Sequence, residues 1–128
     1  MADSTTRRPC AIILTAIPIE YQAVRSHLSN LHEETHTRGT IYECGIFTSE
    51  KHTWDVGIVE VSAGNSRTAV EAERAITYFQ PKLMFFVGVA GGLKDVTLGD
   101  IVVATKVYGY ESGKANTAVS RNLEPVIE

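Results

Sequence analysis

Continuous apolar segments alternate with amphipathic segments along much of the chain. Residues 11–17, AIILTAI, and residues 83–90, LMFFVGVA, are apolar runs rich in β-branched or aromatic side chains. Such runs are typical of strands that are buried on both faces, as in a parallel sheet. We therefore predict a central strand at each of these two positions.

Two segments have the spacing of a helix with one apolar face. Residues 19–31 follow Pro18, which suits the first turn of a helix, and residues 62–80 end before Pro81. We expect Asn65 or Ser66 to cap the second helix. The predicted buried stripes are Tyr21, Val24, Leu28 and Leu31 in the first helix, and Ala69, Ala72, Ile76 and Phe79 in the second.

The remaining strand signals complete an α/β pattern. Residues 40–47 and 54–61 are separated by the polar TSEKHT, which predicts an antiparallel hairpin, and residues 101–110 predict a last strand. The order strand, helix, hairpin, helix, strand, strand predicts a layered α/β domain. We expect a loose tail over residues 1–10, the domain over 11–114, and a polar segment over 115–128.

Composition narrows the class of protein. The 128 residues include 44% hydrophobic and 21% charged residues, which is typical of one globular domain. The net charge is −3, and Arg7-Arg8 is the longest basic run, so we expect neither nucleic acid nor a membrane as a partner. The polar start and the short apolar runs predict a cytoplasmic protein. Cys10 and Cys44 are expected to be reduced thiols, with a single disulfide as the alternative.

The segment HEETH, residues 32–36, matches the H-E-x-x-H pattern of zinc proteases. That pattern requires a helix, because only a helix places His32 and His36 on one face beside the same ion. Here it falls where the predicted helix ends, and the one later histidine is His52 in the hairpin turn. We therefore predict a polar connection and no bound metal.

Small and polar residues follow three of the predicted strands. Glu20 comes after the first strand, SAGN (62–65) follows 54–61, and GVAGGL (88–93) ends the strand that begins at residue 83. Ligands of α/β sheets bind at the carboxyl ends of strands, so these junctions are expected to form one pocket. The glycine segment is also compatible with an ordinary tight turn, and Glu20 with a plain helix-start carboxylate.

Three segments carry a family resemblance. AIILTAIPIE, SAGNSRTAV and QPKLMFFVGVAGGLKDVTLGDIVV resemble the first half of the nucleoside phosphorylase and nucleosidase superfamily, and in particular methylthioadenosine/S-adenosylhomocysteine nucleosidases. The resemblance spans residues 11–114, and it implies a three-layer fold with a central mixed sheet. The ending ATKVYGYESGK is similar to N-terminal modules of large bacterial and fungal signalling or defence proteins.

The resemblance also implies roles for individual residues. Glu20 falls where the family has the acidic residue that positions the attacking water. A small-molecule nucleoside or nucleotide is the expected ligand, no cofactor is expected, and the protein is expected to form a homo-oligomer. The residues nominated for substrate binding are Ala16, Gly64, Asn65, Arg67, Val89, Ala90, Gly91, Tyr108 and Tyr110.

Water is the expected nucleophile of this site. Phosphorylases of the superfamily often carry a hydroxyl residue where this chain has Val89, and a carboxylate at Glu20 would repel a phosphate dianion. Arg67 is the one residue that favours phosphate, because it could reach a phosphate at the helix N-terminus. A solvated arginine on a helix face is the better explanation of it. Phosphorolysis therefore stays open as an alternative.

The ribose carboxylate and the acid that protonates the base belong to the family's second half. The chain ends at RNLEPVIE before either group, which predicts a piece of a longer protein or a naturally shortened relative. Hydrolysis of the N-glycosidic bond of purine nucleosides or nucleotides is the first functional hypothesis. A non-catalytic nucleoside-binding or assembly module is the competing one.

Overall fold

The computed structural model describes residues 7–62 and 64–107. The chain divides into two units, residues 1–96 and 97–128, and the helices and strands of the described residues lie in the first. These elements are β1 (Cys10–Thr15), α1 (Pro18–Arg25), β2 (Ser29–Thr35), β3 (Ile41–Thr48), β4 (Thr53–Glu60), α2 (Asn65–Phe79) and β5 (Leu83–Phe86).

The strands form one mixed sheet in the order β2-β3-β4-β1-β5. β1 is parallel to both of its neighbours, β4 and β5, whereas β3 is antiparallel to β4 and to β2. The predicted hairpin is therefore confirmed as β3 and β4. The predicted central strand at residues 11–17 is confirmed as β1, whose burial on both faces explains its unbroken apolar sequence.

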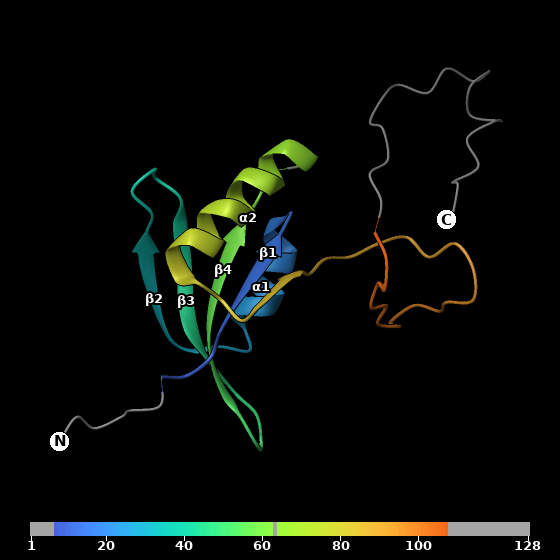
Figure 1. Ribbon diagram of the computed structural model, residues 1–128. Helices are drawn as coiled ribbons and strands as arrows, with labels where there is room; N and C mark the ends of the chain where they lie inside the picture. Colours follow the sequence, from blue (N-terminus) through green and yellow to red (C-terminus); the bar gives the residue numbers. More distant parts are fainter. Residues whose placement is uncertain (1–6, 63, 108–128) are drawn as a thin grey trace. The chain divides into compact units, whose positions relative to one another are not determined.

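One helix covers each face of the sheet (Figure 1). Phe79 of α2 packs edge-on against Tyr42 of β3, with the ring centroids 4.9 Å apart. On α1, Tyr21 Oη donates a 2.8 Å hydrogen bond to Glu43, and the Arg25 guanidinium pairs with the same carboxylate. Because consecutive strand residues point to opposite faces, contacts at Tyr42 and Glu43 place the two helices on opposite sides. The predicted α/β architecture is confirmed.

The buried face of α2 differs from the predicted stripe. Ala75 is fully buried in the main apolar cluster, and Ala72 and Phe79 pack against it. Ile76 is 52% exposed, and Ala69 is exposed as well. The sequence contains two overlapping helical spacings, and the chain buries the one that brings small alanines against the sheet.

The segment after α1 is the largest departure from the sequence prediction. The helix ends at Arg25 instead of Leu31, and Ser29–Thr35 pairs antiparallel with β3 as strand β2. HEETH therefore lies mostly in an edge strand, and the predicted polar connection is wrong. Pairing with β3 satisfies the backbone of this polar segment, and that long-range contact outweighs the local helical spacing.

The last two strand predictions are also corrected. β5 ends at Phe86 rather than Ala90, and residues 101–107 form no strand within the described part of residues 101–110. Ile101, Val102 and Val103 are 73–92% exposed. An apolar sequence favours burial, but a strand forms only where another strand supplies hydrogen-bond partners. Among the described strands, none pairs with residues 101–107.

Two further expectations can be compared with the structure. Cys10 and Cys44 are both free cysteines in the structure. None of the helices in the described residues has the length and apolar character needed to span a bilayer.

Candidate functional site at the carboxyl ends of the parallel strands

The parallel strands β1, β4 and β5 bring the segments that follow them close together at their carboxyl ends. The Val61 N–H, just after β4, donates to the Thr15 carbonyl at 2.7 Å, and the Val87 N–H, just after β5, donates to the Leu14 carbonyl at 2.9 Å. The exits of β1, β4 and β5 are therefore neighbours. This is the edge at which ligands of α/β sheets bind.

The Glu20 side chain accepts hydrogen bonds from the backbone that follows β1 and from the backbone that follows β5. Glu20 is the third residue of α1, and its Oε2 accepts hydrogen bonds from the N–H groups of Ala16 at 2.9 Å and Ile17 at 3.2 Å. Its Oε1 accepts a 3.0 Å bond from the N–H of Val89, beyond β5. The side chain caps the helix start, as a glutamate at the third position can, and also reaches a turn 69 residues away.

These bonds hold Glu20 in its charged form. The Val89 N–H lowers the pKa of the carboxyl most, the Ala16 N–H follows, and the Ile17 N–H adds a smaller effect against the opposing desolvation. The residue is only 8% exposed. Because its pKa is lowered by folding, its contribution to stability is present at neutral pH and is lost as pH falls through the lowered value.

The carboxylate retains capacity for one more partner. A carboxylate offers about four lone-pair positions, and three backbone N–H groups take three of them. The remaining position suits a single donor, such as a water molecule. The arrangement can therefore fix both the charge and the direction of a polar ligand.

Gly88 begins the GVAGGL segment expected at the pocket, but it is not among the residues nominated there for substrate binding. A Cβ at this position would lie 2.8 Å from Glu20 Oε1 and 3.1 Å from its Cδ. The carboxylate is held by three backbone bonds, so it cannot swing aside as the end of a flexible side chain would. A glycine directly after a buried strand was the available signal, since it marks close approach of another group to the backbone.

The nominated residues around the turn after β5 contribute unequally. Val89 presents its N–H to Glu20 while its side chain is 77% exposed. Ala90 and Gly91 are exposed, and a Cβ on Gly91 would meet nothing within 4 Å. Tyr108 and Tyr110 lie outside the described residues. The structure thus joins Ala16, Glu20 and Val89 directly.

The loop between β4 and α2 differs from its predicted capping. Gly64, with φ of 126°, is the N-cap, and neither Asn65 nor Ser66 caps the helix. A positive φ of this kind favours glycine strongly over other residues. Arg67 is exposed and donates a 2.8 Å hydrogen bond to Ser62 Oγ, so its guanidinium is engaged beside the exit of β4.

A hollow of about 620 Å³ lies next to this loop, between α2 and the ends of β3 and β4. Ser62, Ser66 and Arg67 line it, together with the Glu71–Arg74 ion pair. Glu20 does not line it. Within this chain, the carboxylate and the hollow are separate features of the same edge of the sheet.

Comparison with known proteins decides the family. A sequence profile of the Phosphorylase superfamily matches residues 11–123. The chain belongs to the Phosphorylase superfamily. The resemblance seen in the strand-end motifs is thereby confirmed.

Two relatives of this chain are nucleosidases by name. The chain is 27% identical to the ATP nucleosidase Cap17 of Escherichia coli over 119 residues, which cover 89% of this chain and 24% of the relative. It is 29% identical to a 5′-methylthioadenosine/S-adenosylhomocysteine nucleosidase of Halalkalibacterium halodurans over 112 residues, covering 80% and 46% of the two chains. The chain thus spans less than half the length of either relative.

Solved structures show the same fold. The 5′-methylthioadenosine/S-adenosylhomocysteine nucleosidase of Colwellia psychrerythraea, in complex with adenine, superimposes with a TM-score of 0.58 at 24% identity, covering 68% of this chain and 34% of that one. The Streptococcus pneumoniae enzyme in complex with 8-aminoadenine gives 0.55 at 27% identity, covering 66% and 36%. The mixed sheet and two helices of this chain match about a third of each solved nucleosidase chain.

Proposed function

We propose that this chain forms the water-positioning half of a purine nucleosidase site, with Glu20 as its catalytic residue. The observation that carries the proposal is the ionised carboxylate held by three backbone N–H groups where parallel strands end. The similarity to two kinds of nucleosidase supports hydrolysis of an N-glycosidic bond. A fixed carboxylate serves that reaction by orienting water and by stabilising positive charge on the sugar.

The proposed reaction has a defined role for Glu20. The bond between the ribose carbon and the base nitrogen breaks, and its electron pair leaves with the base. The water oxygen then bonds to the oxocarbenium carbon and becomes acidic. Glu20 accepts the released proton, which a carboxylate of low pKa can do because the oxonium donor is a far stronger acid. The family resemblance assigns protonation of the base to the half of the domain that follows this chain's residues.

Adenine is the proposed base. The two curated relatives act on ATP and on 5′-methylthioadenosine or S-adenosylhomocysteine by name, and the solved relatives hold adenine or 8-aminoadenine. Ala16, Gly64, Asn65, Arg67, Val89, Ala90 and Gly91 are the proposed substrate-binding residues among those described. Gly64 and Gly91 allow a ligand to approach the backbone closely.

A cytoplasmic homo-oligomer is part of the same proposal. Phe85 and Phe86 on β5 are about half exposed, and β5 occupies an edge of the sheet. Exposed apolar side chains on an unpaired edge favour association with another chain or segment.

The choice of nucleophile can be tested with phosphate. Val89 offers no hydroxyl group, Arg67 is engaged with Ser62, and Glu20 would repel a phosphate dianion. In a complete domain containing this chain, we expect the Val89→Ser variant to gain no turnover from added phosphate. The measurement is base release with and without phosphate, with ribose 1-phosphate monitored. Wild-type turnover that rises with phosphate and yields ribose 1-phosphate would instead make the domain a phosphorylase.

A second test uses the 128-residue chain by itself. The resemblance places the acid that protonates the base outside these residues, so we expect no release of adenine from adenosine, methylthioadenosine or ATP above the uncatalysed rate. Chromatography of free adenine against protein concentration makes the measurement. Release that scales with protein and disappears in Glu20→Gln would show that the acid lies within this chain.

A further inference from the structure

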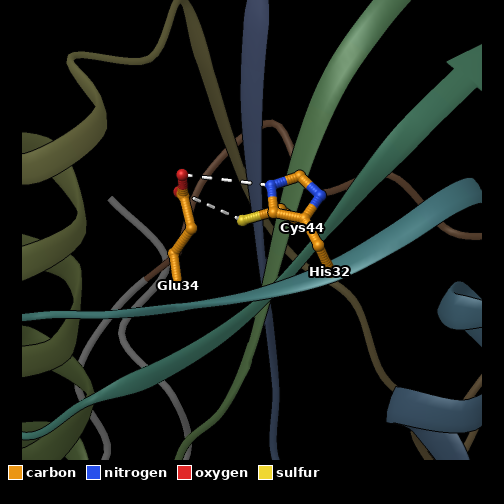
Figure 2. Close-up of side chains that lie close together, drawn as sticks. All are labelled: His32, Glu34 and Cys44. Atoms are coloured by element: carbon orange, nitrogen blue, oxygen red, sulfur yellow. Dashed lines mark hydrogen bonds and ion pairs between the residues drawn. The ribbon is translucent and has the colours of Figure 1, made fainter.

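Three side chains with metal-binding atoms gather on the β2–β3 pair, at a distance from the Glu20 edge. His32 of β2 is directly opposite Cys44 of β3 in the antiparallel register. Glu34 follows His32 by two positions and therefore points to the same face. The three side chains converge on that face of the sheet (Figure 2).

The distances between these side chains approach those of a metal coordination sphere. Cys44 Sγ is 3.4 Å from Glu34 Oε2, His32 Nε2 is 3.9 Å from Glu34 Oε1, and one ligand atom from each residue lies within 4.8 Å of the others. Zinc bonds of about 2.0–2.3 Å at tetrahedral angles separate neighbouring ligand atoms by about 3.4–3.6 Å. The Cys44–Glu34 pair already has this spacing. The exposed His32 ring lies farther out, 3.9 Å from Glu34 and within 4.8 Å of the other ligand atoms, and has to move inward to complete the coordination sphere.

We propose that His32, Glu34 and Cys44 form a binding site for a divalent transition metal of the zinc type. The set of one imidazole nitrogen, one carboxylate oxygen and one thiolate sulfur suits zinc and disfavours magnesium and calcium, which take oxygen ligands. Three protein ligands leave the fourth tetrahedral position to a water molecule or another small ligand. The buried Cys44 anchors the site, and His32, with 60% of its side chain exposed, closes it from the solvent side.

This site uses other residues than the H-E-x-x-H motif of the same segment, which pairs His32 with His36. It also departs from the sequence-based prediction that the segment binds no metal. In a strand, residues four apart are separated by about 13 Å, so His32 and His36 cannot share an ion. His36 instead packs against Tyr78, with ring centroids 5.7 Å apart, and its Nδ1 accepts a hydrogen bond from the Arg38 N–H. The alternating H-x-E pattern with a cysteine on the next strand is the relevant motif.

The surroundings define how an ion must bind. Burial and the nearby Glu34 carboxylate together raise the pKa of the Cys44 thiol to about 12, and burial has the larger effect. Zinc binds the thiolate, so an incoming ion displaces the Cys44 proton. The cluster opens into a hollow of about 690 Å³, where Arg8 is already paired with Asp55 at 2.9 Å. Arg7 and Lys82 line the same hollow and oppose a cation, whereas the thiolate and Glu34 attract it.

Zinc titration of the untagged 128-residue chain tests the proposal. Competition with a chromophoric chelator, under a non-chelating reductant, should give one zinc per chain. The variants His32→Ala and Cys44→Ser should each weaken binding by at least about tenfold, since loss of even an outer-shell partner typically costs 10–100-fold. Cobalt should give a thiolate charge-transfer absorption in the wild type and none in Cys44→Ser.

Two histidine variants provide matched controls. His36→Ala removes the other histidine of HEETH, and His52→Ala removes an exposed histidine of the β3–β4 hairpin. Both should bind zinc as the wild type does, and circular dichroism should show all variants folded. The surface position of His32 makes His32→Ala the decisive variant if Cys44→Ser unfolds. Zinc binding that is absent, unchanged by His32→Ala, or abolished by His36→Ala would overturn the proposal.

Discussion

Replacing Glu20 by glutamine in a complete nucleosidase domain that contains this chain should reduce turnover by about a hundredfold or more, the scale for losing a positioned acid–base group. Nucleoside affinity should stay nearly unchanged, because Glu20 acts on the water and not on the base. Glutamine keeps the volume but loses the charge. Its amide nitrogen would also face one of the three backbone N–H donors that now bind the carboxylate.

The measurement is steady-state release of base, with nucleoside affinity determined separately by titration calorimetry. Glu73→Gln is the matched control, because Glu73 is an exposed glutamate on α2. In the wild type, the acidic limb of the pH profile should lie below the ordinary range of a glutamate, since hydrogen bonds to Val89 and Ala16 lower the Glu20 pKa. Full turnover in Glu20→Gln would reduce the residue to a helix-capping role.

Replacing Gly88 by alanine should reduce turnover to a similar extent as Glu20→Gln, although Gly88 has no catalytic side chain. The new Cβ would lie 2.8 Å from Glu20 Oε1, so either the carboxylate or the turn after β5 has to move. Displacement of about 1 Å at a reacting group can cost about a hundredfold in rate. Loss of the Val89 N–H bond, the largest cause of the lowered Glu20 pKa, should also move the acidic limb of the pH profile upward.

Gly91→Ala is the matched control for this variant. It lies three residues away in the same turn, and a Cβ there would meet nothing within 4 Å. Because Glu20 is not displaced, the turnover number and the acidic limb of the pH profile should match the wild type, and any effect of the new methyl group on substrate binding should appear in KM alone. Equal losses in the two variants would show that the turn tolerates no side chain anywhere, and would remove the steric argument for Gly88.

The zinc site illustrates how a change of secondary structure changes chemistry. HEETH has the spacing of a helical zinc motif, but its residues 32–35 belong to β2. A strand separates His32 from His36 and brings His32 beside Glu34 and Cys44. The relevant partner lies on another strand, so only the β2–β3 register reveals it.

The local sequence correctly predicted those elements whose pattern of apolar and polar residues agrees with their burial in the folded sheet. Residues 11–17 and 83–90 are almost entirely apolar, and β1 and β5 overlap them as parallel strands of one sheet. Residues 40–47 and 54–61 have a short polar connection, and they pair as the predicted hairpin. The strand-end motifs also contained enough information for the superfamily to be recognised, because glycines and the acidic residue follow buried strands in a fixed order.

Only the tertiary structure decided features that depend on contacts distant in sequence. The stretch from Ser26 to Thr35 has apolar residues at helical spacing, yet an available edge on β3 converts residues 29–35 into a strand. Residues 101–107 have a strand-like composition, yet none of the described strands pairs with them. The spacing of apolar residues indicates which side chains favour burial. Whether a segment becomes a strand depends on which other strand the fold places next to it. For the same reason, Glu20 looked like a helix-start carboxylate until the turn after β5 supplied the Val89 N–H and the close approach of Gly88.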